Sequence, residues 1–101
     1  MSPTARSLKK LRDEGCLVDI VERRAGGRLH DLFGFLDLLC ITADGDVLGI
    51  QTTSGSNVSA RIKKITNHQN VGRVRDANIG IHVHGWRKAK GKWICRTVDL
   101  S

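Results

Sequence analysis

A single aspartate, Asp37, interrupts an otherwise apolar stretch at residues 36–43. An unpaired buried charge is costly, so an acid in such a stretch either performs chemistry or has structural hydrogen-bond partners. Gln51 and Thr53 lie at the end of a second apolar stretch. A carboxylate, a carboxamide and a hydroxyl offer oxygen atoms of the kind that Mg²⁺ prefers. We therefore predict a catalytic site at these three residues, with Asp37 and Gln51 as metal ligands.

Each candidate also has a structural interpretation. A buried Gln51 equally suits hydrogen bonding to its neighbours, and Thr53 is an ordinary strand residue. Because Gln51 is neutral, it binds a metal ion more weakly than a carboxylate does. Glu22 or Asp31 is the candidate for an additional carboxylate, although acids in such positions are often simply solvated.

Two strands joined by a tight turn are expected to place Asp37 beside Gln51. The apolar runs at 36–43 and 47–53 flank Asp44-Gly45, a dipeptide typical of hairpin turns. Alternate residues of a strand share one face, so Gln51 and Thr53 are predicted to point toward whatever Asp37 faces.

The remaining patterns complete an α/β order. Ser2-Pro3 begins a helix over about 3–14, and a strand over 16–24 ends where residues 25–28 break it. A second helix is predicted at 57–68, followed by strands at 78–86 and 92–100. The order is α-β-β-β-α-β-β. We expect one small α/β domain over residues 1–101, with a mixed central β-sheet flanked by two helices.

The charge balance favours a polyanionic partner. Lys and Arg number 17 against 10 Asp and Glu, which gives a net charge of +7. The tryptophans Trp86 and Trp93 flank a basic turn at 87–92; they suit either stacking on bases or core packing, and core packing is favoured for Trp93. The candidate nucleic-acid contacts are Arg61, Lys63, Lys64, Arg87, Lys88, Lys90 and Lys92.

Other classes of protein are disfavoured. No apolar stretch approaches the 18 or so residues of a membrane span, so no membrane partner is expected. Cys16, Cys40 and Cys95 lack C-x-x-C spacing and indicate buried free thiols in a reducing cytosol, hence a cytoplasmic protein. His82 and His84 alternate on one strand, but the histidines lack the spacing of a zinc site.

Three local patterns coincide with this order and together resemble the PD-(D/E)XK nuclease superfamily. Gly34-Phe35-Leu36-Asp37 is similar to the G-x-x-D motif of archaeal Holliday-junction resolvases and of small phage or VRR-type nucleases. Gln51-Thr52-Thr53 stands in the place of E-x-K. The helix predicted next occupies the place of the second core helix in the family's αβββαβ order, and the resemblance extends over about residues 5–98.

The resemblance implies a restriction-endonuclease-like fold and a DNA endonuclease dependent on Mg²⁺ or Mn²⁺, with branched or junction DNA among its substrates. It also implies a homodimer and a phage or prophage origin. In the family a carboxylate stands at the position of Gln51 and a lysine at that of Thr53. Here both differ, so Lys64 or Arg61 is our candidate for the missing positive charge, and Glu22 is the additional metal ligand.

The substituted motif leaves two other functions open. Gln51 and Thr53 are also what degeneration of E-x-K would produce, and a catalytically inactive nuclease-fold protein would still bind nucleic acid. A small protein-interaction factor with incidental charge is the third hypothesis. On the predicted helix, Arg61, Lys64 and His68 form one polar stripe at i, i+3 and i+7, and if this stripe faces the cleft, Lys64 or Arg61 can replace the lysine of E-x-K.

Overall fold

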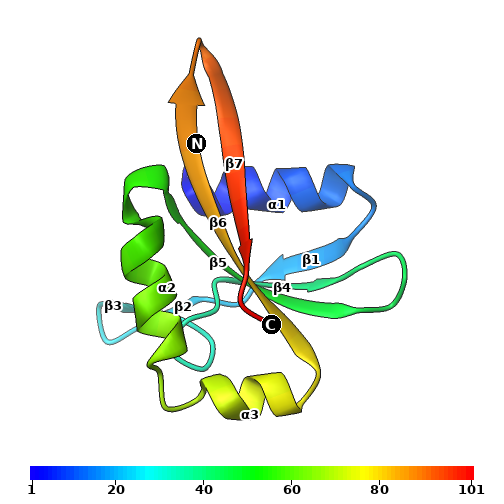
Figure 1. Cartoon of the computed structure of the whole chain (residues 1–101), viewed down its shortest axis with the longest axis vertical. Coiled ribbons are helices and arrows are strands. Elements are labelled where there is room, and N and C mark those ends of the chain that lie inside the picture. The colour runs from blue at the N-terminus through cyan, green and yellow to red at the C-terminus, as the bar shows by residue number, and fades with distance from the viewer.

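The two apolar runs on either side of Asp44-Gly45 form the centre of a five-stranded mixed sheet (Figure 1). The computed structural model describes all 101 residues, which fold into one small α/β domain. The elements in chain order are α1 (Pro3–Asp13), β1 (Leu17–Ile20), β2 (Arg23–Ala25), β3 (Arg28–His30), β4 (Leu38–Ile41), β5 (Val47–Ser54), the 3₁₀ turn η1 (Gly55–Asn57), α2 (Val58–Thr66), α3 (Val71–Asp76), β6 (Ile79–Ala89) and β7 (Lys92–Asp99).

The strand order across the sheet is β1-β4-β5-β6-β7. Neighbouring strands are antiparallel except β5 and β6, which run parallel because the chain returns through α2 and α3 before β6 begins. The β4–β5 hairpin turns at Gly45, whose φ of +89° a side-chain-bearing residue rarely adopts. This hairpin fixes the register in which the second half of β5 meets the residues just before β4.

Each face of the sheet has its own apolar core. On one face α1 packs over β1, β4 and β5, and on the other α2 and α3 pack over β6. Leu38, Cys40 and Ile50 face α1, so the residues that alternate with them face α2. Burial raises the pKa of the Cys40 thiol to about 12, which makes it unreactive, whereas the other two cysteines are partly exposed rather than buried.

The strand predicted at 16–24 is divided. β1 ends at Ile20, and β2 pairs with β3 across Gly26-Gly27 as a separate two-stranded sheet. Both glycines have positive φ, so the segment that looked like a break is a hairpin turn.

The prediction of two helices was also wrong, because the six-residue α3 covers the start of β6 as a third. The helix predicted at 57–68 ends at Thr66. His68 therefore lies beyond the helix and outside the polar stripe; its ring packs edge-on against Phe35, with 5.2 Å between centroids. No helix combines the length and apolarity that a bilayer crossing requires.

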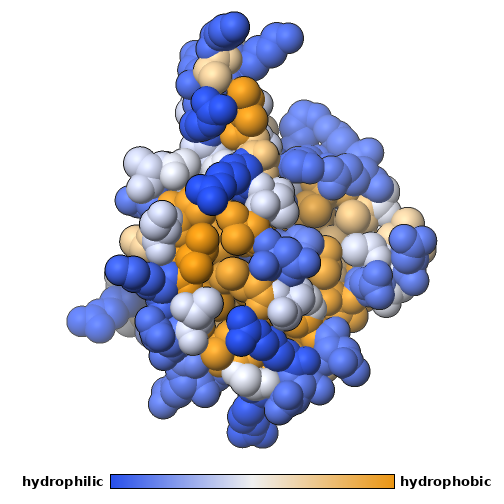
Figure 2. All heavy atoms as spheres, viewed as in Figure 1, coloured by the Kyte–Doolittle hydropathy of each residue, from blue (hydrophilic) through white to orange (hydrophobic).

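The β6–β7 hairpin extends well beyond the rest of the molecule (Figure 1). It closes at Lys90-Gly91, and both residues have positive φ. Figure 2 shows that the projecting end is mostly hydrophilic, whereas hydrophobic residues gather over the middle of the face in view.

Candidate active site

Asp37 lies just before β4 and is held by backbone hydrogen bonds on both sides. Its N–H donates to the Ile50 carbonyl of β5 at 2.8 Å, and its own carbonyl accepts from the Val21 N–H at 2.9 Å. Gln51 and Thr53 of β5 face the α2 side of the sheet, and the Asp37 carboxylate, at the end of β4, contacts Gln51 from that side and Thr52 from the other. All three side chains are buried, with Asp37 only 4% exposed.

One oxygen of Asp37 is fully engaged. Oδ2 accepts from Gln51 Nε2 at 2.8 Å, from the Thr52 N–H at 2.7 Å and from Thr52 Oγ1 at 3.1 Å. Oδ1 accepts no hydrogen bond from the protein, and no fully buried side-chain oxygen lacks a partner. Oδ1 is therefore accessible from the pocket that Asp37 lines.

Gly34 explains why a glycine precedes Asp37 by three residues. Its φ is +93°, and a Cβ placed there would lie 2.4 Å from Nε2 of His68. The tight loop around it is closed by the Leu32 N–H, which donates to the Leu36 carbonyl at 2.8 Å. This loop returns the chain so that Asp31, on its entering side, lies close to Asp37.

Three carboxylates converge at this point. Glu22, Asp31 and Asp37 each present an oxygen, and these oxygens all lie within 4.8 Å of one another. Burial raises the pKa of Asp37 to about 7; the neighbouring Asp31 raises it further, and hydrogen bonds from Thr52 and Gln51 oppose the rise. Such a concentration of negative charge and oxygen ligands fits a hard divalent cation.

A lysine from α2 reaches the same cluster. Nζ of Lys64 lies 3.2 Å from Oδ2 of Asp31 and 3.3 Å from Oε1 of Gln51. Arg61, one turn earlier on α2, lines the pocket. The structure thus brings together Asp37, Gln51 and the positive charge of Lys64, and Thr53 on β5 lines the same pocket.

The site opens to solvent through a pocket of about 550 Å³. Its wall includes residues that the sequence patterns did not suggest: the start of α1 (Ser2, Pro3 and Thr4) and Leu29 of β3. Oγ1 of Thr4 is 2.7 Å from Oγ1 of Thr52, which fixes the beginning of α1 beside the site. The sequence showed the helix start at Ser2-Pro3, but only tertiary packing places it here.

The other predicted contacts lie elsewhere. Lys63 is exposed on α2, and none of the basic residues of the β6–β7 hairpin lines the pocket. The prediction that Trp93 packs in the core was wrong: the side chain is 45% exposed, and the Arg6 guanidinium stacks 3.7 Å from its ring centroid.

The opposite face of the sheet holds a second buried polar cluster. Ser7 of α1 accepts a hydrogen bond from Trp86 Nε1 at 2.9 Å, and its Oγ lies 2.9 Å from Nδ1 of His84. Burial lowers the pKa of His84 to about 4, so its imidazole is neutral at pH 7. Ser7 and His84 line none of the four main pockets, and their hydrogen bond ties α1 to β6.

The cluster around Asp37 combines three carboxylates, the ammonium group of Lys64 and an open pocket, a set of groups that suits a hydrated divalent cation. No protein-family model, curated protein or solved structure matches the chain.

Proposed function

We propose that this chain is a metal-dependent DNA endonuclease of the PD-(D/E)XK, restriction-endonuclease-like type. The observation that supports it most is the convergence of Glu22, Asp31 and Asp37 in an open pocket, with Lys64 in contact with Asp31. Once the β2–β3 hairpin, α3 and the final strand β7 are set aside, the remaining order α1-β1-β4-β5-α2-β6 follows the αβββαβ order of that superfamily.

The three carboxylates and the Gln51 carboxamide are the groups that would hold Mg²⁺ or Mn²⁺. Carboxylates outside the E-x-K position offset the neutrality of Gln51, since they supply the negative charge from the two ends of the β2–β3 hairpin. A bound divalent ion supplies charge neutralisation for a phosphate and lowers the pKa of a bound water.

The chain's own cations would orient the substrate. Lys64 approaches the cluster from α2 and takes the role of the lysine that E-x-K provides from the strand. Arg61 lines the pocket and is placed to bind a phosphate oxygen. The Thr53 hydroxyl, at the pocket wall, is able to hydrogen-bond a water or a phosphate but supplies no positive charge.

DNA is the proposed substrate because the chain has a net charge of +7 and a projecting basic hairpin. The basic residues of that hairpin, Arg87, Lys88, Lys90 and Lys92, are suited to phosphate contacts that position the duplex. Branched DNA and a homodimer, whose two-fold symmetry would match a four-way junction, stay predictions.

Cleavage of plasmid and four-way-junction DNA with Mg²⁺ or Mn²⁺ tests the proposal. We expect cutting by the wild type and none above background by Asp37→Asn, which keeps the shape but removes the charge. Lys64→Gln should lose on the order of 10² to 10³ in rate, as expected for a group that stabilises charge in the transition state. Asp76→Asn, an exposed acid on α3, is the matched control and should cut normally.

A catalytically inactive DNA-binding protein is the second candidate. It is favoured by the closed contacts of Gln51, whose Nε2 donates to Asp37 while its Oε1 lies near Lys64. In that case the wild type binds DNA equally well in EDTA and in Mg²⁺ and cuts neither substrate. Metal-dependent cutting that requires Asp37 excludes this candidate.

A further inference from the structure

The β2–β3 hairpin contains three arginines that the fold itself does not use. Arg23, Arg24 and Arg28 are all exposed, and none forms an ion pair or a side-chain hydrogen bond. No acid lies within residues 23–30. Three like charges on one short ribbon repel one another, and a polyanion bound there would remove that repulsion.

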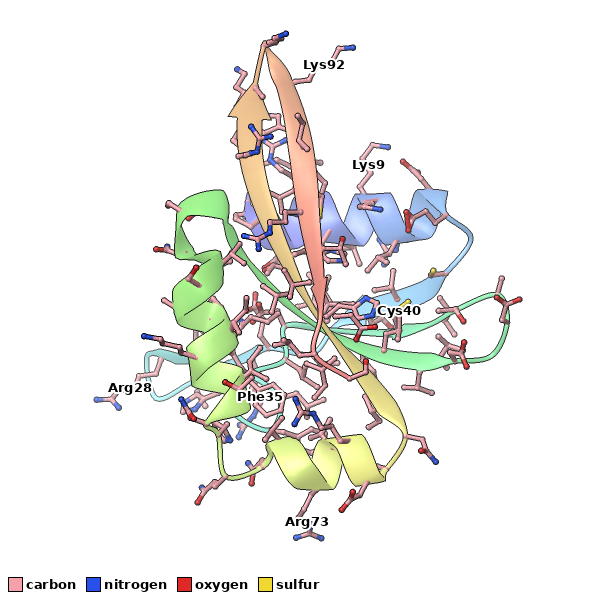
Figure 3. The ribbon with its side chains drawn as sticks, viewed as in Figure 1. Lys9, Arg28, Phe35, Cys40, Arg73 and Lys92 are labelled. Carbon is pink, nitrogen blue, oxygen red and sulfur yellow. The ribbon has the colours of Figure 1, made fainter.

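The same hairpin ends in two acids of the site. β2 begins directly after Glu22 and β3 ends directly before Asp31, and the first ladder pair joins Arg23 to His30. The element is therefore acidic at its base, where it meets Asp37, and basic toward its tip. Figure 3 shows Arg28 at the outer edge of the molecule, pointing away from the body.

The arginines are close enough to the acid cluster to contact the same duplex. Arg28 precedes Asp31 by three residues, about 10 Å along an extended strand. A duplex with one phosphate at the acid cluster therefore has further phosphates of its backbone within reach of the arginines.

The composition of the ribbon favours duplex over single-stranded DNA. Proteins that bind single strands stack bases on aromatic side chains, and residues 23–30 include no Phe, Tyr or Trp. A two-stranded ribbon with a Gly-Gly turn is narrow enough for the major groove, which is about 12 Å wide.

We infer that the β2–β3 hairpin is a DNA-binding arm, whose arginines contact the backbone of duplex DNA beside the phosphate held at the Asp37 site. This rests on the proposed function and extends it, since the cations named there lie on α2 and on the β6–β7 hairpin. It also gives the ribbon a second role, because DNA held by the arm lies next to Glu22 and Asp31.

The test measures duplex binding in EDTA across a range of salt concentrations, so that cleavage plays no part. The arm variant is the double substitution Arg24→Gln/Arg28→Gln. Its control, Lys9→Gln/Arg73→Gln, also removes two positive charges, but from α1 and α3. Each lost phosphate contact lowers the salt slope by about 0.9, so the arm variant should bind roughly 60-fold more weakly at 0.1 M salt, with a slope smaller by about 2. The control should change affinity less than about threefold, and Arg24→Lys/Arg28→Lys should retain most of it.

If the wild type binds duplex DNA tightly and the arm variant binds it as well as the control does, the hairpin is not a DNA-binding arm. That result leaves the nuclease proposal intact. Wild-type protein that binds no DNA overturns both. Tighter binding of single-stranded than of duplex DNA overturns the assignment of the duplex. The arm variant should unfold at the same temperature as the wild type, and the lysine variant should still bind DNA. These two results show that a loss of affinity comes from lost contacts and not from lost folding.

Discussion

The sheet has a buried polar cluster on each face, and the two clusters differ in charge and in access to solvent. Beneath α1, Ser7 links His84 and Trp86, and His84 stays neutral. On the α2 side, Asp37 shares its surroundings with two more acids and lines an open pocket. Asp37, Ser7 and His84 are all buried, so burial alone does not distinguish a structural network from a candidate site.

The comparison shows which property does distinguish them. The Ser7 hydroxyl lies at hydrogen-bonding distance, 2.9 Å, from both His84 and Trp86, and this cluster has no net charge at pH 7. Around Asp37 the hydrogen bonds engage only Oδ2, and the excess negative charge is only partly balanced by Lys64. A buried charge that the protein leaves unbalanced lowers the stability of the fold. A cation that binds beside such a charge restores that stability, so an unbalanced charge suits a cation site.

The largest expected effect is a gain of stability on removing the Asp37 charge. The pKa of the Asp37 carboxyl is about 7 in the folded protein and 3.8 in the unfolded chain. The stability that the protonated carboxyl gives the fold is therefore fully present below pH 3.8 and is lost as pH rises through 7. At about 1.4 kcal/mol per pH unit, Asp37→Asn should raise the free energy of unfolding at pH 8, without metal, by up to about 4 kcal/mol. Urea unfolding in EDTA measures this. A variant less stable than the wild type at pH 8 would contradict it, and Asp76→Asn should change stability by less than about 0.5 kcal/mol.

The cluster beneath α1 should respond in the opposite direction. Ser7→Ala leaves the Trp86 N–H and Nδ1 of His84 without their partner, which should cost about 2 kcal/mol of unfolding free energy. Cleavage by the folded fraction should be unchanged, because Ser7 does not line the pocket. Thermal unfolding alongside Ser59→Ala, an exposed serine on α2, provides the control. An unchanged unfolding temperature would mean that the cluster contributes nothing to stability.

The smallest expected effect is a pH dependence of cation binding. Because Asp37 must lose its proton to bind a cation, the apparent Mg²⁺ affinity should fall about tenfold from pH 8 to pH 6. At saturating metal this removes about 1.4 kcal/mol of stabilisation, which thermal unfolding with increasing MgCl₂ measures. Equal stabilisation at both pH values, or in Asp37→Asn, would show that the cation binds elsewhere.

The sequence predicted the parts of the fold that depend on local patterns. The β4–β5 hairpin followed from Asp44-Gly45 and strand alternation, and these place Asp37 beside Gln51. The hairpin of β2 and β3 was missed because its strands have only three residues each, too few for alternation to show. The six-residue α3 was missed for the same reason, since only Val71 and Val74 mark its buried side.

The site was predictable only as a set of residue types. Nothing in the sequence separates Glu22 and Asp31 from solvated acids, because their convergence on Asp37 depends on the fold of the whole segment between them. Contact of Lys64 with Asp31 joins residues 33 positions apart. The prediction for Trp93 was wrong because β7 is an edge strand with most of its side chains exposed. The apolar neighbour Ile94 suggested a buried segment instead.

Glu22 and Asp31 lie at the base of the β2–β3 hairpin, whose strands pair only with each other. Adding one residue to each strand would lengthen the ribbon by about 3.3 Å and leave the pairing at its feet intact. An unequal insertion would instead shift the register and turn side chains over. The length of this ribbon can therefore change without moving the two acids at its base.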